Sequence, residues 1–259
     1  MLLPNRVSIV TGGAKGIGKG IALEFAEQGS SIIIADVLEK EANQTVKEIS
    51  RKGIDAIFIK CDHTDSHQVK KMTEGAISKF GKIDILVNNA GGFGKQTPVT
   101  DLGEDDWDRT IALNLKGVFL CSKEVVPHMI KRRYGRIINM SSIAAISAGP
   151  PSPHYSASKG GILSFTLDLA LELARFNITV NAILPGTIRT DMWKSNIPPG
   201  DDEDSFFQQM AKTHVPLQRI GTPEDVAGAA LFFASNLSSY VTGDRIIVAG
   251  GLPLQVPPF

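Results

Sequence analysis

Short, nearly continuous apolar runs alternate along this chain with longer segments in which apolar residues recur at helical spacing. The short runs are rich in β-branched residues and predict strands buried on both faces. We expect strands at residues 7–11, 31–35, 56–60, 83–87, 136–140, 178–184 and 246–249. We expect helices at residues 17–28, 38–51, 66–79, 104–132, 155–175 and 223–234. This alternation predicts an α/β fold, a Rossmann-like, doubly wound parallel sheet of about seven strands with helices on both faces.

The domain organisation follows from the same pattern. No repeat, low-complexity tract or composition shift marks a boundary, so residues 1–259 are expected to form a single domain. Residues 187–216 break the rhythm, because they contain no predicted strand and carry an acidic run at 201–204. A long insertion after the carboxyl end of a strand predicts a lid over a substrate site.

Composition and charge narrow the function classes. The chain is 42% hydrophobic and balances 27 basic against 27 acidic residues. We therefore expect no partner of strong charge, neither nucleic acid nor a membrane surface. No apolar run is long enough to span a bilayer, and the first residues do not resemble a secretion signal. Cys61 and Cys121 form no CxxC pair and are expected to be reduced. The expectation is a soluble cytoplasmic protein.

A glycine-rich turn follows the first predicted strand. Residues 11–18 read Thr-Gly-Gly-Ala-Lys-Gly-Ile-Gly and lead into a predicted helix. Glycines there allow the backbone to approach a pyrophosphate at the helix start. We expect cofactor contacts from Gly12, Lys15, Gly16, Ile17 and Gly18. The spacing differs from Gly-x-Gly-x-x-Gly, so a strand-to-helix turn without a ligand is the alternative.

Asp36 ends the second predicted strand and bears on the choice of cofactor. A carboxylate there can accept hydrogen bonds from the adenosine ribose, and it would repel a 2′-phosphate. We therefore predict NAD over NADP. Lys15 favours a 2′-phosphate, whereas Val37 supplies no arginine beside Asp36. The structural alternative for Asp36 is a helix cap.

Tyr155 and Lys159 stand four residues apart, on one face of a predicted helix. A nearby ammonium and an oxidised nicotinamide could together lower the pKa of a phenol toward neutrality. Ser142 follows the fifth predicted strand at its carboxyl end, where open α/β sheets bind ligands. Taken singly, a surface Tyr–Lys pair and a turn-capping serine are the alternative interpretations.

Several motifs follow one another in a specific order. They are the turn at 11–18, Asn-Asn-Ala-Gly at 88–91, Asn114, Ser142, Tyr155-x-x-x-Lys159 and Pro185-Gly186. In this order the chain resembles the short-chain dehydrogenase/reductase family over essentially its whole length.

That resemblance implies a role for each matching residue. Tyr155 would be the general acid/base, Lys159 would hold the nicotinamide ribose, and Ser142 would orient the substrate oxygen. Asn114 would bend its helix and anchor a water linked to Lys159; by its pattern alone it is an exposed helix residue. The remaining cofactor contacts implied are Asp62 at the adenine, residues 88–91 with Asn89, Ala90 and Gly91, and Pro185, Gly186, Ile188 and Thr190. No metal is expected.

The predicted reaction interconverts a secondary alcohol and its ketone by hydride transfer. Residues 92–94, 143–154 and 187–216 should shape the substrate pocket, and their side chains are mostly apolar. The apolar candidates are Phe93, Ile143, Met192, Trp193, Phe206, Phe207 and Met210. This favours a cyclic or otherwise apolar small molecule over a sugar. Phe206, Phe207 and Met210 also fit a lid helix that packs on its own body. His154 is expected to be a packing residue.

Two further functions stay open. One is an NADPH-dependent 3-oxoacyl-thioester reductase of the same family. Lys15 favours it, as does a basic stretch able to dock an acidic carrier, formed by Lys131, Arg132, Arg133 and Arg136. The other is a catalytically inactive nucleotide-binding module, which the fold alone does not exclude. The complete set of Asn114, Ser142, Tyr155 and Lys159 speaks against it.

The family resemblance also implies a homotetramer, formed through the long helices of the fourth and fifth crossovers. The apolar, proline-rich tail at 251–259 is expected to pack on a neighbouring subunit. Ala249 stands where many family members carry an aspartate, in the region of a subunit interface.

Overall fold

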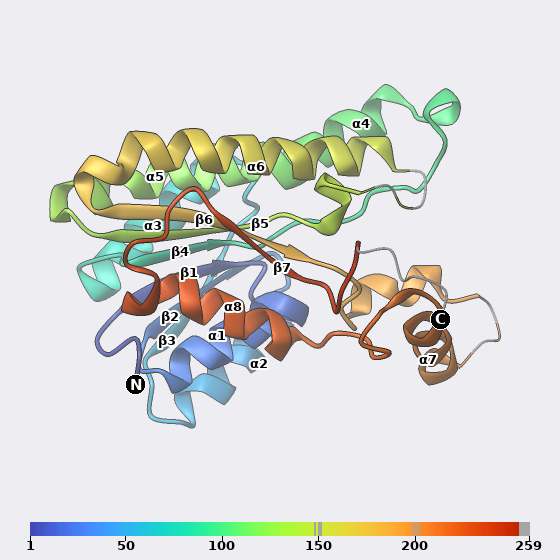
Figure 1. Ribbon diagram of the computed structural model, residues 1–259. Helices are drawn as coiled ribbons and strands as arrows, with labels where there is room; N and C mark the ends of the chain where they lie inside the picture. Colours follow the sequence, from blue (N-terminus) through green and yellow to red (C-terminus); the bar gives the residue numbers. More distant parts are fainter. Residues whose placement is uncertain (148, 150–151, 199, 201, 254–259) are drawn as a thin grey trace.

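The computed structural model describes residues 1–259 except 148, 150, 151, 199, 201 and 254–259. Its centre is a parallel sheet of seven strands in the order β3-β2-β1-β4-β5-β6-β7 (Figure 1). The strands are β1 (Val7–Thr11), β2 (Ser31–Asp36), β3 (Ala56–Lys60), β4 (Ile85–Asn88), β5 (Gly135–Met140), β6 (Ile178–Pro185) and β7 (Arg245–Val248). The predicted doubly wound sheet is therefore confirmed, with small differences at strand ends.

Helices cover both faces of the sheet. They are α1 (Gly16–Glu27), α2 (Glu39–Ser50), α3 (Ser66–Phe80), α4 (Glu104–Ile111), α5 (Gly117–Arg132), α6 (Pro153–Leu173), α7 (Glu203–His214) and α8 (Pro223–Ala234). In Figure 1, α3, α5 and α6 lie on one face, and α1, α2 and α8 lie on the other. α7 stands apart from both layers, beside the carboxyl ends of the strands.

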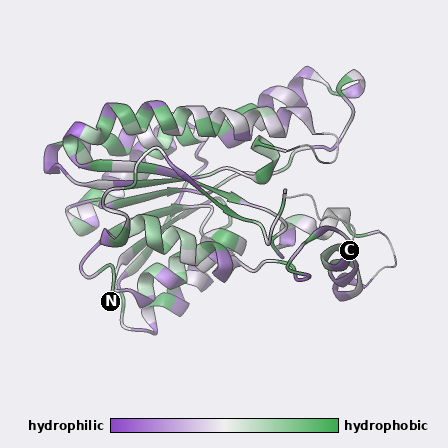
Figure 2. Cartoon of the chain, in the orientation of Figure 1, coloured by the Kyte–Doolittle hydropathy of each residue, from purple (hydrophilic) through white to green (hydrophobic). Residues whose placement is uncertain are grey.

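Two apolar clusters form the core, one on each face of the sheet. Alternate residues of a strand point to opposite faces, so Ile34 packs with Phe25 and Phe233, whereas Ile33 packs with Met72. All five side chains are fully buried or nearly so. Figure 2 shows the strands mainly in the hydrophobic colour. Burial on both faces explains why the inner strands β1, β2, β4, β5 and β6 read as continuous apolar runs, while the edge strands β3 and β7 are only partly buried.

The chain reverses direction at the centre of the sheet. It moves outward from β1 to β3 and then returns to β4 on the other side of β1. The connections from β1 and β4 therefore leave in opposite directions and open a crevice at the carboxyl ends of these strands.

The structure departs from the predicted elements in two places. The predicted helix at 104–132 is divided by a π-helical turn, η2 (Ala112–Lys116). The described residues of 187–216 contain no strand, as expected, but they include a 3₁₀ turn, η5 (Asp191–Asn196), and α7. The tail at 254–259, expected on a neighbouring subunit, lies outside the described residues. No helix in the described part of the chain is both long and apolar enough to cross a bilayer.

Candidate active site

The glycine turn after β1 leads directly into α1. Gly12 has a φ of +63°, and a Cβ there would lie 2.9 Å from the Cα of Ala90. A Cβ on Gly18 would lie 2.1 Å from the carbonyl oxygen of Gly12. Both positions therefore require glycine. Among the described residues no side chain caps the start of α1, so its first amide groups face the cavity ready for an anion.

Asn89 fastens the end of β4 to this turn. Its side-chain nitrogen donates to the carbonyl oxygens of Thr11 and Gly12, at 2.9 and 3.1 Å. The hydroxyl of Thr11 in turn accepts from the amides of Asn89 and Ala90, at 3.0 and 3.1 Å. These bonds hold the two diverging connections together and fix the floor of the crevice.

Asp36 ends β2 at the far side of the turn and is 9% exposed. Its Oδ2 accepts from the amide of Ala14 at 2.9 Å, and its Oδ1 from the amide of Leu38 at 3.0 Å. The second bond closes a local turn before α2, whose N-cap is Leu38 and which has no side-chain cap, so Asp36 is not the helix cap considered from the sequence. Because each oxygen has a further lone pair, the carboxylate remains able to accept ribose hydroxyls.

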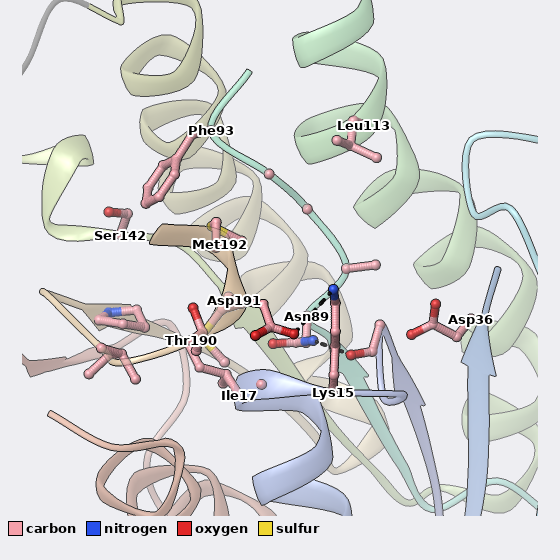
Figure 3. Close-up of a pocket in the computed structure, with 18 of the residues that line it drawn as sticks. Lys15, Ile17, Asp36, Asn89, Phe93, Leu113, Ser142, Thr190, Asp191 and Met192 are labelled. Atoms are coloured by element: carbon pink, nitrogen blue, oxygen red, sulfur yellow. Dashed lines mark hydrogen bonds and ion pairs between the residues drawn. The ribbon is translucent and has the colours of Figure 1, made fainter. Parts of the chain in front are cut away.

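Lys15 extends from the turn in another direction. Its Nζ lies 3.6 Å from Oδ2 of Asp191, at the start of η5, and both side chains are about half exposed. The Lys15 ammonium therefore pairs with the lid residue Asp191 rather than with Asp36. Figure 3 shows Lys15 and Asp36 toward one end of the cavity, and Phe93 and Ser142 toward the other.

Asp62 and His63 follow β3 on the side of Asp36. Asp62 Oδ1 accepts from the amide and hydroxyl of Thr64, at 2.9 and 2.7 Å, and these bonds lower the pKa of Asp62. His63 is buried, which lowers its pKa, and its Nε2 donates to the carbonyl oxygen of Leu113 at 2.7 Å. Sequence reasoning missed His63, because no motif includes it.

Ser142, Tyr155 and Lys159 meet at the carboxyl end of β5. The first turns of α6 place Tyr155 and Lys159 on one face, 8% and 5% exposed. Tyr155 shares a hydrogen bond with Ser142. Lys159 Nζ donates to the carbonyl oxygen of Met140 at 2.9 Å and lies 5.6 Å from the centre of the Tyr155 ring.

Burial governs the protonation of this group. It raises the pKa of Tyr155 to about 12, against a smaller lowering by the Ser142 hydrogen bond. It lowers the pKa of Lys159 to about 8. The chain by itself therefore does not lower the pKa of Tyr155, because the loss of hydration raises that pKa more than the hydrogen bond lowers it. A further positive charge is needed to ionise the phenol near neutrality.

Asn114 lies inside the π-helical turn and is fully buried, so its interpretation as an exposed residue is wrong. Its Nδ2 donates to the carbonyl oxygens of Gly92 and Thr110, at 2.9 and 3.1 Å. Its Oδ1 accepts from the amide of Gly92 at 3.1 Å. The side chain thus anchors the segment after β4 to the interrupted helix, as the predicted bend requires.

Most of the predicted residues line one cavity of about 400 Å³. All the predicted cofactor-binding residues except Gly18 line it, together with Ser142. Gly18 packs against the carbonyl of Gly12, and Asn114 is hydrogen-bonded to the lining residue Gly92 without lining the cavity itself. Asn88, the first residue of the expected 88–91 segment, points into the sheet instead and donates to Asn139 Oδ1 at 2.8 Å.

The substrate end of the cavity is aromatic. Phe93, Met192 and Trp193 line it, as expected. The ring of Phe93 contacts Tyr155 and Trp193 edge-on, with centroids 5.1 and 5.4 Å apart.

Other expected pocket residues lie elsewhere. Ile143, Phe206, Phe207 and Met210 are not among the described lining residues. Phe207 is buried, its ring centroid lies 5.5 Å from that of Phe206, and the Arg189 guanidinium lies 5.1 Å from its ring, which favours packing over pocket lining for this residue. His154 is fully buried outside the lining, and neither ring nitrogen has a hydrogen-bond partner.

The groups that line the cavity fit a nicotinamide dinucleotide rather than a metal ion. A glycine turn at a helix start, a carboxylate about 20 residues further on, and a long cavity suit its pyrophosphate and ribose. Within the described residues, no group of three or more His, Cys, Asp or Glu side chains could hold a metal.

The proteins that the chain resembles in sequence are named as reductases and dehydrogenases. Residues 12–253 match a family model described as enoyl-(acyl carrier protein) reductase. The chain is 41% identical over 254 residues to a (2S)-[(R)-hydroxy(phenyl)methyl]succinyl-CoA dehydrogenase subunit, BbsD, from Thauera aromatica, covering 98% of this chain and 99% of that one. It is 41% identical over 252 residues to the 3-oxoacyl-[acyl-carrier-protein] reductase FabG of Thermotoga maritima, covering 97% and 99%.

Solved structures agree in fold. A 7α-hydroxysteroid dehydrogenase in complex with NADH and 7-oxo glycochenodeoxycholic acid superposes with a TM-score of 0.90 at 38% identity, covering 96% of this chain and 94% of that one. An NAD⁺-bound xylitol dehydrogenase gives a TM-score of 0.90 at 34% identity, covering 97% and 100%.

Proposed function

The chain belongs to the short-chain dehydrogenase/reductase family, and we propose that it is an NAD-dependent enzyme interconverting an apolar secondary alcohol and its ketone. The observation that carries the proposal is the meeting of Ser142, Tyr155 and Lys159 at the end of a cavity lined by the glycine turn. The relative from Thauera aromatica is named as a dehydrogenase of a hydroxy(phenyl)methyl-succinyl-CoA, which is a ring-bearing secondary alcohol and also a CoA thioester.

Each residue of this group has a task in the proposed reaction. Tyr155 gives its phenolic proton to the carbonyl oxygen in reduction and takes the hydroxyl proton in oxidation. Ser142 holds the same oxygen by a hydrogen bond, and Asn114 keeps the segment after β4 in place. A nicotinamide cofactor held by the glycine turn and Asp36 would take up or supply the hydride, and its oxidised form would add positive charge. Together with the Lys159 ammonium, that charge would oppose the burial that raises the Tyr155 pKa to about 12.

The preference for NAD rests on Asp36 and Lys15. The Asp36 carboxylate is fixed by two backbone amides and would repel a 2′-phosphate. The Lys15 ammonium lies beside Asp191, which draws it away from that position.

A second function has support of its own. An NADPH-dependent 3-oxoacyl-thioester reductase would use Lys15, whose side chain is 52% exposed, and the Thermotoga maritima relative carries that name. Its proposed carrier patch is reduced by the fold. Arg132 pairs with the buried Asp84 at 2.9 Å, and Arg136 is 3% exposed beneath Tyr134. Lys131, Arg132 and Arg133 remain at the surface, so Arg136 is the one member of the four that the fold buries.

We also propose a cytoplasmic homotetramer. The free, buried thiols of Cys61 and Cys121 suit a reducing compartment. Leu167 and Leu171 on α6 and Phe119 on α5 expose 54%, 83% and 45% of their surface, which supports pairing through these helices.

The deciding experiment follows nicotinamide absorbance with ring-bearing alcohols, linear secondary alcohols, sugars and 3-hydroxyacyl thioesters, each with NAD and NADP. We expect turnover of apolar alcohols with NAD. Tyr155→Phe should abolish it while cofactor binding, followed by fluorescence, persists. Turnover confined to thioesters with NADP would establish the second function. Substantial activity in Tyr155→Phe would assign the proton transfer to another group.

A further inference from the structure

Three aromatic rings form a continuous wall from the catalytic tyrosine to the lid. Phe93 comes from the segment after β4, and Trp193 comes from η5. Phe93 meets the ring of Tyr155 at 5.1 Å and 70°, and that of Trp193 at 5.4 Å and 67°. Both arrangements are edge-to-face, the geometry that aromatic quadrupoles favour. The segments are about a hundred residues apart in the sequence and meet at the cavity.

We propose that Phe93 and Trp193 select a ring carried on the reacting carbon, so that the preferred substrates are aryl or alicyclic secondary alcohols and their ketones. This inference rests on the proposed function and deepens it. The substrate oxygen must reach Tyr155 and Ser142 to react. Because Phe93 lies against Tyr155, a substituent on the reacting carbon contacts Phe93 first and Trp193 next.

The charges of the cavity support a ring rather than an ionised substituent at this end. Lys15 and Lys159 are the cations among the described lining residues. Lys15 is engaged by Asp191, and Lys159 Nζ is held by the carbonyl oxygen of Met140. The side chains at the substrate end, Phe93, Met192 and Trp193, are uncharged. A flat or cyclic apolar group can therefore cover the aromatic wall without burying an unpaired charge.

A purely structural role makes a different prediction. If the Phe93–Trp193 contact only holds the lid in place, its loss should slow every substrate alike. If it recognises a ring, the loss should fall on ring substrates and spare open-chain ones. Comparison of substrates with equal carbon number separates the two, because they differ little in total apolar area.

The test measures kcat/KM for 1-phenylethanol, 1-cyclohexylethanol and 2-octanol, which have the same number of carbon atoms. Phe93→Leu and Trp193→Leu should each lower kcat/KM for the two ring substrates about threefold to tenfold, from the strength of one aromatic contact. The value for 2-octanol should change less than about twofold, on the same reasoning. Trp193→Phe should retain the preference, and cofactor affinity should be unchanged in all variants.

Phe206→Leu is the matched control, because Phe206 is an aromatic residue of the same lid that contacts Phe207 outside the described cavity lining. It should leave the ratio of ring to open-chain kcat/KM unchanged. Equal turnover of all three alcohols by the unaltered enzyme would overturn the ring preference alone. A parallel loss for all three in Phe93→Leu and Trp193→Leu would overturn the recognition role. Absence of any alcohol turnover would instead reject the proposed function itself.

Discussion

Replacing Lys159 by methionine should stabilise the fold while it abolishes turnover. The lysine is 5% exposed, and burial is the cause that lowers its pKa to about 8. Its ammonium has one hydrogen bond, to the carbonyl oxygen of Met140. Methionine has similar length and no charge, so it removes the buried ammonium and keeps most of the packing.

The magnitude follows from the change in pKa. A fall from the ordinary 10.5 to about 8 costs the folded state about 3 kcal/mol at neutral pH. Loss of the hydrogen bond to the Met140 carbonyl destabilises the folded variant by about 1 kcal/mol. The variant should therefore gain about 2 kcal/mol in unfolding free energy, or about 5 °C in Tm for a chain of this length.

The pH dependence has a definite sign. Below pH 8 Lys159 is charged in both states, and the full penalty acts on the folded state. Between about 8 and 10.5 the unfolded state binds more protons than the folded state, so the stability of the unaltered protein rises with pH. The advantage of the methionine variant should therefore shrink across that window.

The assay is urea unfolding of both proteins at about pH 7 and about pH 9.5. The difference should fall from about 2 kcal/mol to about zero, since most of the charging penalty is relieved at the higher pH. Lys123→Met, at an exposed position on α5, is the control and should show no such trend. A variant less stable than the unaltered protein at pH 7, or a difference independent of pH, would refute the reasoning.

Three further predictions concern the cofactor, the interrupted helix and assembly. Asp36→Ala should lower the ratio of kcat/KM with NAD to that with NADP at least tenfold, from the loss of charge repulsion and ribose bonds; an unchanged ratio would remove Asp36 from the cofactor argument. Gly117→Ala should destabilise by about 2 kcal/mol in urea, because its Cβ would lie 2.0 Å from Cδ2 of His63. Gly228→Ala, with open space around its Cβ, should stabilise slightly, and equal effects would contradict this explanation. Leu171→Glu should yield a smaller species in light scattering, and an unchanged mass would argue against assembly through α6.

The inner strands were predictable because they are buried on both faces, whereas the edge strands β3 and β7 are only partly buried and were predicted from their β-branched residues. In β2 (Ser31–Asp36), residues that face opposite sides of the sheet are both buried, so the sequence shows an unbroken hydrophobic run that predicts a strand. β4 begins two residues later than predicted, at Ile85. The preceding Asp84 is buried for another reason, since its carboxylate accepts from the amide of Val7 and pairs with Arg132.

The features that sequence reasoning missed depend on distant contacts. The π-helical turn adds one residue to an otherwise regular helical pattern, and Asn114 stabilises it through Gly92, which lies 22 residues earlier. His63 is placed by its bond to Leu113, 50 residues later. The contact of Phe93 with Trp193 needs two segments that no local pattern relates. Motif order located the catalytic residues, whereas tertiary contacts decide the shape of the wall around them.

The π-helical turn also sets the rotational phase of the helix that follows it. A helix advances about 100° per residue, so one extra residue rotates everything downstream by that amount. α5 buries Cys121, Val125 and Met129 against the sheet only in this phase. Deleting a single residue from 112–116 would restore a regular helix and turn those side chains toward solvent. Substitutions at the exposed positions of this helix therefore keep its phase, whereas the length of its first half is fixed jointly by the core and by Asn114.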